Sequence, residues 1–342
     1  MATLVEVTVR RHKLRMSYEQ EKQVAIEAVV AAAKLCQRVR QERVQAMEKS
    51  DKSPVTVADY GSQAVICRAI AAAFPNDPIV GEETATELRE PTMANQLAQV
   101  TSYVQAVVGD ATSDDVLSWI DRGNNEIGSR YWTLDPIDGT KGFLRQDQYA
   151  VALALVELGE LKLGVLGCPA LPVDPDQPDG EQGVLFVAVR GQGATMVPLS
   201  GGTPQPIHVT AADDVGNMRF VQSVESGHGD QARQDAIAKA VGFTSPSLRM
   251  DSQAKYGAVA AGRAALYLRL PSPKTPDYVE KIWDHAAGVI VVEEAGGRVT
   301  DMYGKPLNFS LGAKLSDNQG VIVSNGVIHD TVLAALQEIS KV

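Results

Sequence analysis

Two aspartates stand three positions apart in the segment 132–145, which reads WTLDPIDGTKGFLR. Asp135 ends an apolar run that predicts a buried strand, and Pro136 prevents that strand from continuing inside a sheet. Gly139 permits a tight turn, and Thr140 is a suitable first residue for a short helix. Two carboxylates beside a helix start suit divalent cations together with a phosphate group. The segment therefore predicts phosphoryl chemistry, which depends mainly on charge neutralisation and alignment.

Further acids stand at predicted structural boundaries in distant segments. Asp51 lies in SDKSPVTVAD, Glu82 and Glu83 in VGEE, and Asp284 in KIWDHAAG. Acids at strand ends and helix starts are partly desolvated, and they repel one another unless a cation lies between them. Ligation by oxygen alone favours Mg²⁺ or Ca²⁺ over zinc or copper. Each acid alone is compatible with a turn, a helix cap or a solvated surface, and only the whole set indicates a metal site.

The composition limits the class of protein. With 342 residues and 44% hydrophobic residues, the chain can build one large domain or two ordinary ones. Its net charge of −10 argues against a broad basic surface for nucleic acid. The three cysteines are widely spaced, which excludes a disulfide framework or a cysteine-based zinc site and favours a reducing compartment. No apolar run approaches the roughly 20 residues of a membrane helix, so no membrane partner is expected.

The N-terminal segment 1–16 carries four Lys or Arg residues and a single acid, Glu6. It lacks the apolar middle of a secretory signal. Two interpretations remain, a solvated tail and a short organellar presequence. The expected location is the cytoplasm, with the chloroplast or mitochondrion as the alternative.

Hydrophobic periodicity predicts helices first, then antiparallel strands, then alternating helices and strands. Helices are expected over 18–47, 56–74, 87–108, 114–121, 231–241, 252–261, 284–295 and 328–339. Strands are expected over 79–81, 149–157, 162–168, 184–189, 194–197, 220–223, 264–270 and 320–324. The segment 169–183 contains four prolines and four acids, which predicts an exposed loop. This order favours a layered α/β or α+β body.

Several long motifs resemble a known superfamily. GEE, DPIDGT and WDHAAG, in this order, resemble the Mg²⁺-dependent, lithium-sensitive phosphatases that include inositol monophosphatase. The fuller segments DKSPVTVADYGSQA, KGFLR, MDSQAKYGA, LYLRLP and EKIWDHAAG are similar to one branch, the 3′(2′),5′-bisphosphate nucleotidases of fungi and plants. The resemblance covers roughly residues 18–341. It implies an α/β (α+β) fold, the layered αβαβα sandwich of the inositol monophosphatase and sugar phosphatase type.

The resemblance also implies an organisation of the chain. A tail over 1–16 would precede a metal-binding α+β part over 17–158, which carries the catalytic motifs. A smaller α/β part over 159–342 would contribute nucleotide-binding residues and Asp284. The site would lie in the cleft between the two parts, and a monomer is expected.

The implied cofactor is Mg²⁺, as two or three ions. The ligands would be acidic side chains and one main-chain carbonyl: Glu82, Asp135, Ile137, Asp138 and Asp284. Asp51 and Thr140 would orient and deprotonate the attacking water, because a hydroxyl bonded to a carboxylate can relay a proton. The reaction would be an in-line attack with no covalent enzyme intermediate, and lithium would inhibit by occupying a magnesium site.

The substrate implied by the resemblance is a nucleotide bisphosphate, bound by Thr140, His228, Ser252, Lys255 and Arg269. The metal ions serve the scissile 3′-phosphate, whereas the 5′-phosphate needs separate cations. Lys255 and Arg269 stand in otherwise apolar or alanine-rich runs, where a cation is paired or functional more often than idle. An inositol-only phosphatase would not need a second cationic pocket.

The expected reaction is hydrolysis of adenosine 3′,5′-bisphosphate (PAP) to AMP and phosphate, within sulfur metabolism. 3′-Phosphoadenosine 5′-phosphosulfate (PAPS) would be a second substrate. One alternative is inositol polyphosphate 1-phosphatase, inositol monophosphatase or fructose-1,6-bisphosphatase activity within the same superfamily. A second alternative is a catalytically weak sensor that binds PAP, against which the intact acidic set argues. A third is a protein that acts mainly as an interaction partner, for which the sequence offers no feature.

Overall fold

The computed structural model describes residues 18–42, 47–48, 54–124, 126–211, 215–225 and 229–339. Within these residues the larger sheet has seven strands, and their order across the sheet follows their order in the sequence. β3 pairs with β4 in parallel, and every later neighbour is antiparallel. The strands are β3 (Ile79–Gly81), β4 (Arg130–Asp138), β5 (Ala150–Glu157), β6 (Glu160–Pro172), β7 (Gln182–Val189), β8 (Gly193–Pro198) and β9 (Gln205–Ile207).

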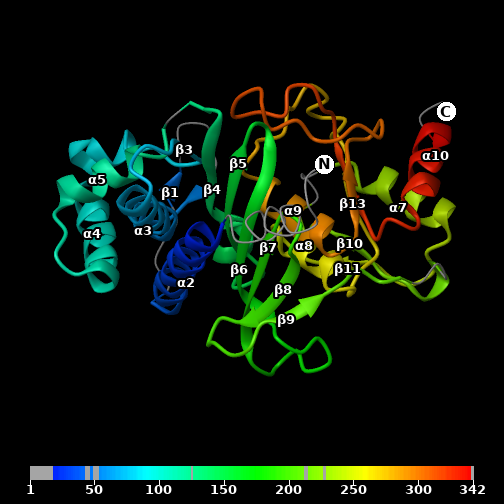
Figure 1. Cartoon of the computed structure of the whole chain (residues 1–342), viewed down its shortest axis with the longest axis horizontal. Coiled ribbons are helices and arrows are strands. Elements are labelled where there is room, and N and C mark those ends of the chain that lie inside the picture. The colour runs from blue at the N-terminus through cyan, green and yellow to red at the C-terminus, as the bar shows by residue number, and fades with distance from the viewer. Residues whose placement is uncertain are drawn as a thin grey trace, which may run out of the picture.

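Both faces of this sheet are covered by helices, which explains why β5 reads as an uninterrupted apolar run, AVALALV. On one face, α2 (Glu19–Gln41) and α3 (Val57–Ala73) pack against alternate strand residues such as Leu153 and Val165. On the other face, α8 (Ala254–Ala260) and α9 (Ala286–Glu294) pack against Ala152, Leu166 and Phe186. α4 (Ala94–Val108) and α5 (Ser113–Asp121) pack beyond α3, at the outer edge of the molecule in Figure 1.

The second sheet has five strands in the order β11-β10-β12-β14-β13. Their bounds are β10 (Phe220–Gln222), β11 (Leu248–Arg249), β12 (Leu266–Arg269), β13 (Arg298–Thr300) and β14 (Val321–Ser324). One face shares the core of α8 and α9, and the other is covered by α7 (Gln231–Val241) and α10 (His329–Ile339). The layers therefore run helix, sheet, helix, sheet, helix, as Figure 1 shows. This arrangement confirms the predicted αβαβα sandwich.

Several predicted elements have different limits in the structure. The helix expected over 87–108 is divided into η1 (Glu87–Arg89), η2 (Pro91–Met93) and α4, because a proline at position 91 lacks the N–H that an α-helix needs. The helix expected from position 284 begins at Ala286 instead. The loop expected over 169–183 is shorter, since β6 continues to Pro172 and pairs there with Gln182 across an irregularity.

Short strands without clear periodicity were missed, namely β9, β11, β13 and the pair β1 (Met47–Glu48) and β2 (Pro54–Val55). The remaining short elements are α6 (Thr140–Leu144) and η3 (Val215–Asn217). The larger sheet is continuous across residue 158, because β5 and β6 pair as a hairpin. The division of the chain into two parts at this position stays a prediction. Among the described helices, none combines the length and apolarity needed to cross a membrane.

Candidate active site

The end of β4 brings two acids to one place. β4 pairs regularly with β5 as far as Asp135, and its register then shifts by one residue before Asp138. Such a bulge bends the strand, and the proline at position 136 fits there because no ladder hydrogen bond is required of it. The backbone N–H of Ile137 donates to Asp135 Oδ1 at 3.1 Å, which fixes the first carboxylate. Gly139, with φ of 86°, then turns the chain into α6.

A cavity of about 700 Å³ lies at this strand end. It is lined by residues from distant segments of the chain, which the sequence analysis had predicted to meet. The predicted residues that line it are Glu82, Asp135, Ile137, Asp138, Thr140, Ser252, Lys255, Arg269 and Asp284. Two further predicted residues, Asp51 and His228, lie outside the described residues.

The acids in this cavity repel one another. Burial raises the pKa of Asp135 well above its ordinary value, and the charges of Glu82, Asp138 and Asp284 raise it further. Burial also raises the pKa values of Asp138 and Asp284, although Arg269 acts in the opposite direction on both. Asp135 is buried, and Glu82, Asp138 and Asp284 are partly buried. Carboxylates that repel one another in a cavity match the donor set of a hard divalent cation. The cluster therefore fits Mg²⁺.

Arg269 is held by two acids at the edge of this cluster. Its Nε donates to Glu280 Oε2 at 2.8 Å, and its Nη2 lies 3.4 Å from Asp284 Oδ2. Glu280 also accepts from Nε2 of the buried His285 at 3.2 Å. Burial alone would raise the pKa of Glu280, but Arg269 and His285 outweigh it and hold that pKa at about 2. The guanidinium therefore carries its charge in a fixed orientation beside the cavity.

Lys255 is the second cation predicted for the substrate, and it is only 3% exposed. Its ammonium lies 5.1 Å from the ring centroid of Tyr267, and it forms no ion pair with any carboxylate of the described residues. Burial lowers its pKa to about 8, against the more distant charges of Asp138 and Asp251. A buried ammonium that lines a cavity without a contacting anion suits an anionic ligand.

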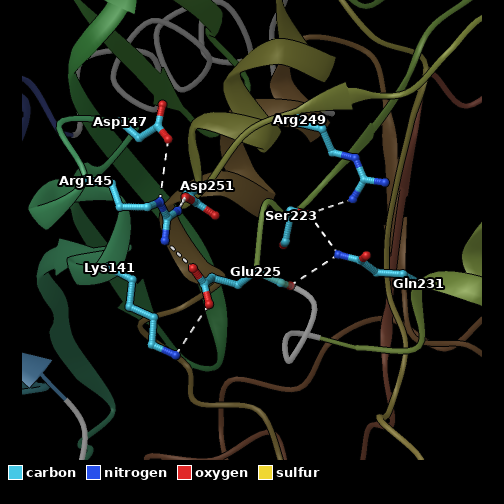
Figure 2. Close-up of polar contacts among 8 residues, drawn as sticks. All are labelled: Lys141, Arg145, Asp147, Ser223, Glu225, Gln231, Arg249 and Asp251. Carbon is cyan, nitrogen blue, oxygen red and sulfur yellow. Dashed lines mark hydrogen bonds and ion pairs between the residues drawn. The ribbon is translucent and has the colours of Figure 1, made fainter.

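Lys141 and Arg145 lie on the rim and are paired with acids, as Figure 2 shows. Lys141 Nζ lies 3.6 Å from Glu225 Oε2, while the Arg145 guanidinium contacts both Glu225 and Asp251. These contacts connect α6 to segments just after β10 and just before α8. The rim cations thus join the elements that surround the cavity.

The sequence analysis missed Asp59, which lies within DKSPVTVAD eight positions after Asp51. Thr140 Oγ1 lies 3.3 Å from Asp59 Oδ1 and 3.3 Å from the Ile137 carbonyl oxygen. Asp59 Oδ2 accepts from the backbone N–H and the hydroxyl of Thr56, forming the capping box of α3. The spacing of Thr56 and Asp59 was the available signal, because it is typical of a helix start and places that acid in the first turn.

Comparison with known proteins agrees with this geometry. Residues 17–341 match the model of the inositol monophosphatase family. A relative from Emericella nidulans, named 3′(2′),5′-bisphosphate nucleotidase, is 44% identical, and the alignment covers 95% of this chain and 100% of the relative. A relative of the same name from Oryza sativa is 43% identical, with 95% of each chain covered. Both confirm the resemblance that the motifs predicted.

Solved structures share the fold. A Thermotoga maritima IMPase superposes with a TM-score of 0.65 at 25% identity, covering 94% of this chain and 98% of that one. An inositol monophosphatase from Anabaena gives a TM-score of 0.60 at 23% identity, covering 94% and 97%. The long family match, the identities above 40% and the shared layered architecture lead to one conclusion. This chain belongs to the inositol monophosphatase family.

Proposed function

We propose that this protein is a 3′(2′),5′-bisphosphate nucleotidase that removes the 3′-phosphate of PAP, giving AMP and phosphate. One observation carries the proposal: a single cavity contains a cluster of acids around the buried Asp135 and, beside it, two cations, the buried Lys255 and the partly buried Arg269. Acids suit metal ions at a scissile phosphate, whereas separate cations suit a second phosphate. The names of the fungal and plant relatives support the same substrate.

The acidic cluster supports Mg²⁺ as the cofactor, and the number of ions proposed, two or three, is the one that the family resemblance implies. Its ligands would be Glu82, Asp135, Asp138, Asp284 and the main-chain carbonyl of Ile137. When bound, Mg²⁺ would neutralise the phosphate oxygens and acidify a water molecule.

The chain's own contribution to proton transfer is the contact between Thr140 and Asp59. A hydroxyl that donates to a carboxylate can accept a proton from water on its other side. Asp59 is 1% exposed, and the cap of α3 fixes one of its oxygens, so the other keeps its direction toward Thr140. This proposal gives Asp59 the role that the sequence analysis predicted for Asp51.

The second phosphate would bind to the cations on the other side of the acidic cluster. No carboxylate in the part of the chain that the structure describes contacts the ammonium of Lys255, and Arg269 provides a guanidinium held in place by Glu280. Ser252 lies on the adjoining segment of the cavity wall and offers a hydroxyl. PAPS carries the same 3′-phosphate and would be a second substrate. A monomeric state, a cytoplasmic location and a place in sulfur metabolism remain predictions.

The deciding experiment is phosphate release from PAP, PAPS, inositol 1-phosphate, inositol 1,4-bisphosphate and fructose 1,6-bisphosphate by the full chain. It is carried out with and without Mg²⁺ and with increasing lithium. We expect PAP to be hydrolysed fastest, only with Mg²⁺, and with inhibition by lithium. Equal or faster turnover of an inositol or sugar phosphate would assign the protein to another branch of the family. Tight binding of PAP without phosphate release would indicate a sensor.

A further inference from the structure

Gln253 connects the two candidate metal ligands Asp138 and Asp284, which come from opposite parts of the chain. Its backbone N–H donates to Asp138 Oδ2 at 2.6 Å. Its side-chain Nε2 donates to the carbonyl oxygen of Trp283 at 2.9 Å, directly before Asp284. Its Oε1 accepts from the backbone N–H of Gly288 at 3.0 Å, in the first turn of α9. Gln253 is only 1% exposed, so these three hydrogen bonds lie in the interior of the protein.

The backbone of Gln253 has little room to move away from Asp138. The preceding Ser252 has φ of 65°, a left-handed conformation that a serine adopts only when its surroundings impose it. A Cβ on Gly139 would come within 3.1 Å of Ser252 Cβ, so the two segments are in close contact. Asp251 is tied to Arg145 at the end of α6, as Figure 2 shows. The segment 251–253 is therefore fixed against the turn that carries Asp138.

The side chain of Gln253 fixes the other ligand. The first N–H groups of a helix have no partner within the helix, and the N-cap residue of α9, His285, provides no side-chain cap. The Gln253 amide satisfies one of these groups at Gly288 and also holds the carbonyl of Trp283. Asp284 lies between these two anchored positions in the chain. The contacts of Gln253 therefore hold the main chain at Asp284 at a fixed distance from Asp138.

We propose that Gln253 is a positioning residue that holds Asp138 and Asp284 at the spacing required for divalent cations before any cation binds. Without such a device, two repelling carboxylates on separate elements would move apart, and metal binding would have to reverse that movement. A neutral amide suits the task because it adds no charge to the acidic cluster. The inference rests on the proposed function, since it assumes that both acids bind metal.

The test is a titration of the full chain with Mn²⁺ in the absence of substrate. Binding is measured by the loss of the electron paramagnetic resonance signal of free Mn²⁺. Gln253→Met keeps the length of the side chain and removes both amide contacts. We expect about 10–100-fold weaker Mn²⁺ binding, the usual effect of losing an outer-shell partner. In steady-state assays, the Mg²⁺ concentration for half-maximal rate should rise by a similar factor, while kcat at saturating Mg²⁺ changes less.

Gln222→Met is the matched control. Gln222 is also fully buried, but its Nε2 bonds to Asp235 Oδ1 on α7 at 2.7 Å and it does not line the cavity. Its variant should bind Mn²⁺ within twofold of the wild type. Gln253→Asn is a milder second variant, because the shorter amide cannot reach both Trp283 and Gly288, and it should show a smaller loss.

Three outcomes would overturn the inference. Wild-type Mn²⁺ affinity in both folded Gln253 variants would remove the positioning role and leave the proposed function intact. An equal loss in Gln222→Met would show that any buried amide has this effect. A wild-type protein that binds no Mn²⁺ and releases no phosphate from PAP would overturn the proposed function and the inference together.

Discussion

Thr140 Oγ1 lies 3.3 Å from Asp59 Oδ1, although 81 positions separate the two residues in the chain. The other oxygen of Asp59 closes the capping box of α3, with the Thr56 hydroxyl at 2.6 Å. One carboxylate therefore completes a helix cap and meets the hydroxyl at the start of α6. The cap of α3 and the proposed proton transfer therefore depend on the same side chain. A second capping box without a contact to Thr140 can show how much of any effect comes from the cap alone.

Asp59→Asn should lower kcat for PAP by about 10²–10⁴-fold, because an amide cannot accept the proton that Thr140 passes on. Asp115→Asn is the matched control, since Asp115 closes the same kind of capping box with Thr112 at the exposed start of α5. Both variants should lose stability through the weakened cap. Phosphate release and urea denaturation measure the two effects. Near-normal kcat in Asp59→Asn would return the role to Asp51.

Asp135→Asn should abolish PAP hydrolysis and yet stabilise the protein in EDTA. The pKa of Asp135 is raised by burial and by three neighbouring acids, so its charge at pH 7 works against folding when no cation is present. An amide oxygen can still accept from the Ile137 N–H. We expect the free energy of unfolding in EDTA to be higher for this variant than for the wild type.

The control for this effect is Asp301→Asn. Asp301 is also buried, but its carboxylate accepts from the backbone N–H groups of Tyr303 and Lys305, and its charge is therefore stabilised. The change should lower the free energy of unfolding while phosphate release persists. A loss of stability in both variants would contradict the repulsion inferred at the acidic cluster.

Lys255→Met should raise KM for PAP at least tenfold and affect kcat less, because the lost ammonium would contact the phosphate that does not react. The same variant should change KM for 3′-AMP, which lacks the second phosphate, by less than threefold. Lys255 is a cleaner target than Arg269, whose removal would leave Glu280 buried beside His285 without its cation. Lys141→Met, on the paired and exposed rim, is the control. Equal KM effects on the two substrates would remove the role of Lys255.

His329 should make the protein lose stability in mild acid. Its side chain is fully buried, and burial lowers its pKa to about 4. Thr300 donates its hydroxyl hydrogen to the Asp301 carbonyl, so it accepts from His329 Nε2, and Ser324 can donate to Nδ1. This pattern matches a neutral ring.

The pKa of His329 is lower in the folded than in the unfolded state. The contribution of the neutral His329 to folding stability is therefore complete above pH 6.5 and is lost as the pH falls toward 4. The loss amounts to roughly 2–3 kcal/mol. Between pH 6.5 and 4, the free energy of unfolding measured by urea denaturation should fall less in His329→Gln than in the wild type. The exposed His208→Gln should behave like the wild type. An unchanged slope in His329→Gln would contradict the assignment.

The sequence by itself determined the local elements around the site. The apolar run before Asp135 made β4 predictable, but the expected end at Asp135 was wrong, since the strand continues past Pro136 to Asp138 across a bulge. Gly139 then sets the turn into α6. The periodicity of α3 and α7 likewise placed both helices within a residue or two of their ends. These features depend on residues within one or two turns of each other, so the sequence carries them directly. The long motifs in turn carried the family resemblance, and with it the expected fold.

Only the tertiary structure decided which partners these elements meet. Periodicity shows that α3 has a buried face, but it does not show that Asp59 on that helix reaches Thr140. The sequence analysis placed Gln253 within the motif MDSQAKYGA and an expected helix, but nothing in either showed that it contacts Asp138 and Trp283. Such contacts depend on how the layers of helices and sheets pack. Packing fixes the distances between segments that lie far apart in the sequence.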